Sequence, residues 1–96
     1  MRIFAIMNPQ QRQQLKARAH SLKPIVITGH AGVSAALLAE IDRALEHHEL
    51  MKVRINAATR EEARALAAQI SEALTAELVQ VLGHVVTLFR EKRNKP

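Results

Sequence analysis

The chain has 96 residues, nearly half of them hydrophobic, which suits one compact domain and argues against a disordered chain. It contains no cysteine, so disulfides, thiolate nucleophiles and cysteine-based zinc sites are excluded. The net charge of +5 is uneven: residues 1–39 hold five bases and no acid, residues 40–89 five bases and eight acids, and residues 90–96 four bases and one acid. Basic ends indicate an anionic partner, with a solvated basic surface as the alternative.

The first residues show no targeting signal. The apolar run from Ile3 to Met7 is shorter than the apolar region of about 7–15 residues in a signal peptide. No stretch approaches the roughly 18 apolar residues that span a bilayer. We therefore expect a cytoplasmic protein with no membrane partner, an N-terminal extension over residues 1–8, and a start at either Met1 or Met7.

Asn8 and Pro9 predict the start of the first helix, because asparagine is a good N-cap and proline suits the first helical position. The helix is expected to run from about Pro9 to His20. Arg12, Lys16 and His20 lie four residues apart and therefore share one face of it.

A short β-branched run, Pro24–Thr28, predicts a buried strand. The tetrapeptide Gly29-His30-Ala31-Gly32 follows it, and a second helix follows the tetrapeptide, with Ser34 as its expected cap and its end near His47-His48-Glu49. The apolar residues of this helix recur at the helical period: Val33, Leu37, Ile41, Ala44 and Leu45.

Alternation predicts the second strand. Met51, Val53 and Ile55 alternate with Lys52, Arg54 and Asn56, which indicates one buried face and one solvated basic face.

Thr59, with Glu62 three residues later, predicts a capping box at the start of a third helix. The apolar stripe of this helix is made of Ala63, Leu66, Ala67, Ile70, Ala73 and Leu74. Two further strands, Leu78–Leu82 and Val85–Phe89, are separated by Gly83-His84, which fits a type II′ hairpin.

The resulting order, α-β-α-β-α-β-β, is that of a single small α/β domain with a four-stranded sheet. Both strand–helix–strand units are expected to cross over right-handed and to give parallel pairing. The terminal hairpin is antiparallel, so the sheet is predicted to be mixed. Residues 9–90 form the expected domain, and residues 91–96 form a basic tail.

The segment Gly29, His30, Ala31 and Gly32, the Gly-x-x-Gly loop, is the most informative motif. Its glycines permit tight backbone angles and close approach by a ligand, and the helix that follows presents free amides and a positive dipole end. These are the parts of a phosphate site, to which Lys16, Lys23 and His30 are near enough in sequence to add positive charge. An ordinary glycine-containing turn is the alternative.

Mononucleotide and dinucleotide sites fit this loop poorly. Val33-Ser34 follows Gly32 where the Walker pattern needs Lys-Ser/Thr, and Gly-x-Gly-x-x-Gly is absent. A polymer backbone is the better guest, as in KH domains. Phe4 and Phe89 are the only aromatics, so stacking of several bases is not expected and contacts should go mainly to phosphate and sugar.

Neither the histidines nor the acids predict an enzyme. His47 and His48 are adjacent and face different directions on a helix, and no His-Glu-x-x-His is present. Ser21, Ser34 and Ser71 have no recognisable base and orienting partner. We therefore expect no catalytic residue, metal or cofactor, and we interpret His30 as a phosphate contact whose charge depends on pH.

Three stretches, residues 22–32, 38–41 and 44–55, strongly resemble the YhbY family, the bacterial stand-alone members of the CRM group (chloroplast RNA splicing and ribosome maturation). The resemblance runs from about Gln10 to Arg90. It implies a fold similar to the C-terminal domain of bacterial translation initiation factor three, and association with precursors of the large ribosomal subunit. The family's Gly-x-x-Gly loop, its expected RNA contact, corresponds to residues 29–32. Many relatives carry a lysine or arginine in or beside the loop, where this chain has His30 and Ala31.

Two hypotheses follow. The first is a monomeric RNA-binding factor for assembly of the large subunit, whose partner is ribosomal RNA or its precursor particle. Its expected contacts are the loop, Lys16, Lys23, Lys52, Arg54 and the bases from Arg90 onward, with Arg12 and Arg18 as weaker candidates. The second is a protein-interaction module that reaches such assemblies without direct RNA contact.

Overall fold

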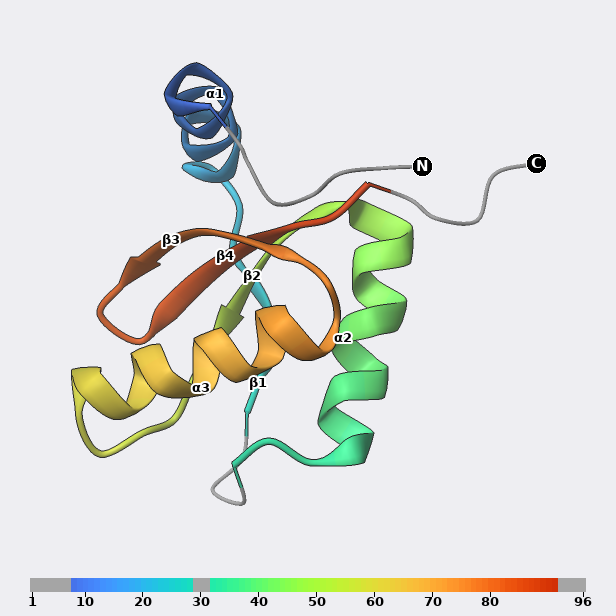
Figure 1. Ribbon diagram of the computed structural model, residues 1–96, viewed down its shortest axis with the longest axis vertical. Helices are drawn as coiled ribbons and strands as arrows, with labels where there is room; N and C mark the ends of the chain where they lie inside the picture. The colour runs from blue at the N-terminus through green and yellow to red at the C-terminus, as the bar shows by residue number, and fades with distance from the viewer. Residues whose placement is uncertain (1–7, 29–31, 92–96) are drawn as a thin grey trace.

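Three helices and a four-stranded sheet make up the part of the chain described by the structure, residues 8–28 and 32–91 of a computed structural model (Figure 1). In chain order the elements are α1 (Pro9–Ala19), β1 (Pro24–Ile27), α2 (Ala35–His48), β2 (Leu50–Arg54), α3 (Arg60–Ala73), β3 (Glu77–Leu82) and β4 (Val85–Phe89). The predicted α-β-α-β-α-β-β order is confirmed. Apart from Asn8 and Glu91, the expected extension and tail lie outside the described residues.

The sheet has the strand order β1-β2-β4-β3 and is mixed, as predicted. β1 pairs parallel with β2, whereas β4 pairs antiparallel with both β2 and β3. The expected parallel pairing of β2 with β3 is wrong, because β4 lies between them. β4 suits this central place, since Val86, Thr87 and Leu88 are all buried, whereas β3 carries the partly exposed Glu77 and Gln80.

β1 is less buried than its β-branched sequence predicts. Val26 is buried, but Ile25 is 50% exposed and Ile27 is 63% exposed. The strand lies at the sheet edge with β2 as its one neighbour, and its pairing shifts register between Pro24 and Val26. An edge position explains how a short apolar run can remain half solvated.

Each face of the sheet has its own apolar cluster. α2 and α3 cover one face through a large core that includes Ile41, Leu45, Val53, Ile70 and Leu88. α1 covers one end of the opposite face through a second cluster made of Leu15, Ala19, Leu50 and Val79, with Phe89 packed against it. α1 therefore partly covers, at the Leu50 end, the face predicted to be wet (Figure 1). Lys52 and Arg54 lie on the remainder of that face.

The predicted helix starts are largely confirmed. Asn8 forms a capping box with Gln11, and the Ser34 hydroxyl accepts the backbone N–H of Leu37 at 3.1 Å. Thr59 accepts the N–H of Glu62 at 3.0 Å, but the Glu62 carboxylate accepts the N–H of Ala58, at 2.7 Å, instead of completing a box with Thr59. These local bonds satisfy amides that the first helical turn leaves unpaired.

The β3–β4 hairpin has the predicted two-residue loop. Leu82 pairs with Val85, and Gly83 has a φ of 60°. Among the described non-glycine residues a positive φ is confined to Glu49 and Thr75, so His84 fits the second position of a type II′ turn.

Candidate nucleic-acid interface

Charge is segregated between the two sides of the sheet. α2 and α3, with the cap residue Glu49, carry seven acids and three bases, whereas α1, the turn after it and the four strands carry six bases and one acid, Glu77. Lys52 and Arg54 alternate with the buried Met51 and Val53 and therefore lie on the face to which α1 packs. We call this side, formed by α1 and the open part of the sheet, the basic face.

A groove beside α1 brings together two of the predicted contacts. It has a volume of about 320 Å³ and is lined by Gln13, Lys16, Ala17, Ala19, His20, Lys52, Gln80 and Leu82. Lys16 comes from α1 and Lys52 from β2, and both residues are half-buried. Two cations from separate elements in one groove suit an extended anionic chain better than a single small anion.

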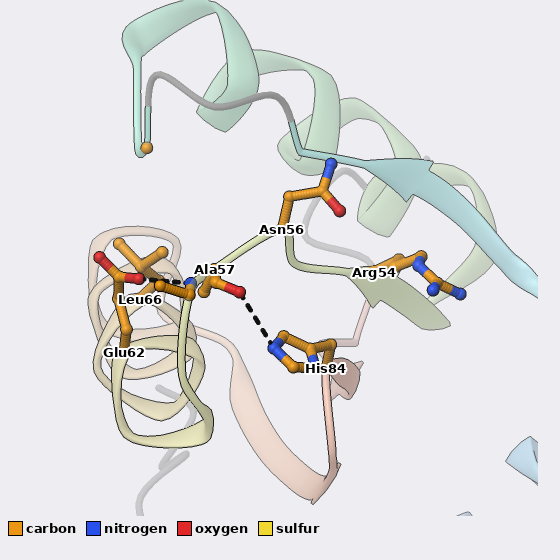
Figure 2. A pocket seen from close by; sticks show the side chains of 8 residues that line it. Arg54, Asn56, Ala57, Glu62, Leu66 and His84 are labelled. Carbon is orange, nitrogen blue, oxygen red and sulfur yellow. Dashed lines mark hydrogen bonds between the residues drawn. The ribbon is translucent and has the colours of Figure 1, made fainter.

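A larger cavity lies at the carboxyl ends of β1 and β2 (Figure 2). We call it the loop-end cavity. It has a volume of about 600 Å³ and is lined by Gly32, Arg54, Asn56, Ala57, Ala58, Glu62, Leu66 and His84. Arg54 therefore shares a surface with the last residue of the Gly-x-x-Gly loop, which the sequence did not establish. Gly29, His30 and Ala31 lie outside the described residues.

Two other predicted contacts lie away from this cavity. Lys23 is exposed and immediately precedes β1, whereas the loop follows β1. Because a strand advances about 3.3 Å per residue, Lys23 and Thr28 are separated by roughly 15 Å. Lys16 lines the groove beside α1 and not the loop-end cavity. The expectation that both lysines add charge at the loop is therefore not supported.

Thr28, the residue before the loop, is fixed to the end of β2. It is only 3% exposed, and its N–H donates to the Arg54 carbonyl at 2.9 Å. The Asn56 backbone N–H donates to the Thr28 hydroxyl at 2.9 Å, and the Asn56 side-chain amide donates to the Thr28 carbonyl at 2.6 Å. Sequence reasoning missed this clamp, since Asn56 shows only the polarity expected at a strand end.

Gly32 requires glycine for its backbone angle. Its φ is +77°, in the left-handed region that side chains disfavour, and nothing lies within 4 Å of the place a Cβ would occupy. The preference for glycine at position 32 therefore comes from the backbone angle and not from close packing against a neighbour.

Two of the predicted contact bases are instead structural. The Arg12 guanidinium donates to the carbonyls of Leu78 and Val79, at 2.9 and 3.0 Å, where the pairing of β3 shifts register. Arg90 is buried and forms ion pairs with Asp42 at 2.8 Å and Glu46 at 3.0 Å. The interpretation of Arg90 as part of a basic contact surface is wrong, because its charge faces the interior.

Neither a metal cluster nor a membrane-spanning helix is found in the part of the chain that the structure describes. Across residues 8–28 and 32–91 no group of three or more histidine, cysteine or acidic side chains is arranged to hold a metal ion. In the same part of the chain no helix has the length and apolarity needed to cross a membrane.

Comparisons with known proteins agree on one family. The CRS1/YhbY (CRM) domain matches residues 7–90. A Haemophilus influenzae protein named an RNA-binding protein is 40% identical over 84 residues, which cover 88% of this chain and 85% of the relative. A Pseudomonas aeruginosa protein named a probable RNA-binding protein is 37% identical over 90 residues, covering 94% of this chain and 86% of the relative.

A solved structure has the same fold. The solution structure of a hypothetical protein from Staphylococcus aureus, provisionally assigned as RNA-binding, is 32% identical, with a TM-score of 0.82 and coverage of 95% of each chain.

Proposed function

Because the chain belongs to the CRS1/YhbY (CRM) domain family, we propose that it is an RNA-binding protein that associates with precursors of the large ribosomal subunit and assists their assembly. In this proposal the Gly-x-x-Gly loop holds the RNA backbone at the start of α2, and the protein acts as a monomer without catalysis. Relatives named as an RNA-binding protein and a probable RNA-binding protein support the RNA partner.

The segregation of charge is the observation that carries the proposal. Lys16 of α1 and Lys52 and Arg54 of β2 lie on the basic face. Arg54 also lines the same cavity as Gly32, the last residue of the Gly-x-x-Gly loop. Phosphate contacts position a nucleic acid without reading its sequence, and they dominate its affinity. A face with several cations and few aromatic rings suits this mode of contact.

A protein-interaction module is the second candidate function. β1 is an edge strand on which Ile25 and Ile27 are at least half exposed, so its free edge and apolar side chains suit a protein partner. In that case the bases would serve solubility or contact an acidic partner.

The test compares a loop variant with a matched control in binding to ribosomal RNA fragments. His30→Asp with Ala31→Asp places two negative charges in the loop and retains both glycines. Ala68→Asp with Gln69→Asp places the same charges on the exposed surface of α3. Circular dichroism checks that both variants fold.

We expect the wild type and the α3 variant to bind alike and the loop variant to bind much more weakly. If about five phosphates of single-stranded RNA are neutralised, the slope of log affinity against log salt is about −3.5. Equal binding by both variants would remove the loop from the contact. Absence of binding by the wild type would favour the protein-interaction module.

A further inference from the structure

The loop-end cavity contains an acid, which sets it apart from the basic face around it. Glu62, in the first turn of α3, lines the cavity together with Arg54 and Gly32. A carboxylate repels phosphate, so it is unfavourable in a site that binds only the RNA backbone. It is instead a good acceptor for the N–H groups of a base edge.

We propose that the loop-end cavity binds one unstacked nucleobase of the RNA, and that the Glu62 carboxylate selects guanine. This inference rests on the proposed RNA-binding function and adds a base-specific contact to it. Guanine presents two adjacent N–H donors, at N1 and the 2-amino group, which match the two oxygens of a carboxylate. Adenine, cytosine and uracil do not present two such donors side by side.

The Glu62 carboxylate is held in place before any ligand arrives. Its Oε1 accepts the Ala58 N–H at 2.7 Å, which fixes the orientation of the group. Oε2 and the second lone pair of Oε1 remain for the two N–H groups of a ligand. Figure 2 shows Glu62 and Leu66 on α3 at one side of the cavity and Asn56 at the end of β2, while Arg54 extends away from Glu62. An acceptor that is already oriented loses little conformational freedom on binding.

The rest of the lining suits a flat aromatic ring. Ala57 and Leu66 are half-buried and supply apolar surface. The His84 ring is anchored, since its Nε2 lies 3.2 Å from the Ala57 carbonyl, and the Asn56 amide is anchored on Thr28. The volume of about 600 Å³ falls within the range of small-ligand pockets, roughly 300–1,000 Å³. A backbone held beside Gly32 would let one base turn into this space.

The test uses four short RNAs: plain oligouridine, and the same RNA with its central uridine replaced by guanosine, adenosine or inosine. Fluorescence anisotropy measures the affinity of the protein for each. Glu62→Gln retains an oxygen that can accept the Ala58 N–H but replaces the second acceptor by a donor. Glu61→Gln is the matched control, because Glu61 is an exposed acid of the same helical turn that does not line the cavity.

We expect the wild type and Glu61→Gln to prefer the guanosine RNA by about tenfold, as for a bidentate base contact. Inosine, which lacks the 2-amino group, should lose much of this preference. Glu62→Gln should bind all four RNAs within about twofold of one another while keeping its affinity for plain oligouridine. A purely structural role of Glu62 would change stability and leave base preference intact.

Two results overturn the proposal and are distinguishable. Salt-dependent binding without base preference, or a preference that survives Glu62→Gln, would leave the RNA-binding function standing and remove the base pocket. Failure of the wild type to bind any of these RNAs or ribosomal RNA fragments would remove both.

Discussion

Replacing Arg90 by methionine removes a buried cation at the end of the sheet. Arg90 is 1% exposed and donates four hydrogen bonds: to the Asp42 carboxylate at 2.8 Å, the Leu74 carbonyl at 2.8 Å, the Asp42 carbonyl at 3.2 Å and the Glu46 carboxylate at 3.0 Å. It thus joins the end of β4 to α2 and to the end of α3. Methionine keeps most of the apolar stem but none of these donors.

The expected loss of stability is smaller than for a fully buried ion pair. Breaking such a pair costs about 3–5 kcal/mol. The Asp42 and Glu46 side chains are 34% and 25% exposed, so water can partly replace the guanidinium, and the Arg90 Nε already lacks a partner. We therefore expect about 2–4 kcal/mol, which for a domain of this size lowers Tm by roughly 10–25 °C.

Thermal unfolding followed by circular dichroism measures this effect. Arg64→Met is the matched control, because Arg64 is exposed on α3 and its replacement should change stability by about 0.5 kcal/mol or less. Arg90→Lys should fall between the two, since it retains the charge but not the forked geometry. A Tm for Arg90→Met within a few degrees of Arg64→Met would refute the reasoning that this ion pair holds the layers together.

Three further substitutions test local features of the structure. Gly32→Ala should cost about 1–2 kcal/mol in urea unfolding because of the left-handed φ, and an unchanged midpoint would contradict that conformation. Arg12→Met should cost about 1–2 kcal/mol through loss of its bonds to β3 and leave RNA affinity near the wild-type value; a large affinity loss in a folded variant would return Arg12 to the interface. Asn56→Ala should cost about 1–2 kcal/mol by removing its amide bond to Thr28, and it should weaken RNA binding more than Arg12→Met does; the reverse order would argue against a role for the clamp in positioning the loop.

Features encoded by neighbouring residues could be predicted from the sequence. Asn8, Ser34 and Thr59 cap helices, because the donors they satisfy lie three residues ahead. Gly83 marks a two-residue hairpin, because a positive φ at that position favours glycine. The resulting element order was correct for the same reason.

Features that depend on distant segments could not be predicted. Nothing near β2 indicates that β4 pairs with it, so the expected β2–β3 pairing was wrong. The sequence places Arg12 and Arg90 among the expected RNA contacts, because charge alone does not reveal a buried partner. The carbonyls of Leu78 and Val79 and the carboxylates of Asp42 and Glu46 come from remote parts of the chain.

The candidate site shows the same division. The alternating pattern of β2 predicts that Lys52 and Arg54 lie on one face of the strand. The structure shows that Lys16 lines the same groove as Lys52, and that Gly32 lines the same cavity as Arg54. Glu62 was assigned only to a helix cap. Its place in the cavity depends on how the first turns of α3 lie relative to Gly32 and to His84 of the β3–β4 turn, which no local pattern specifies.

The salt dependence of RNA binding by two charge-matched variants tests the central claim, that the basic face holds the RNA backbone. The first variant replaces Lys16, Lys52 and Arg54 by glutamine, and the second replaces Arg43, Arg60 and Arg64, which are exposed on the helical side. Each loses three positive charges. On single-stranded RNA the first should bind more weakly with a slope shallower by about 2, and the second should keep the wild-type slope. Equal slopes for the two variants would contradict the account.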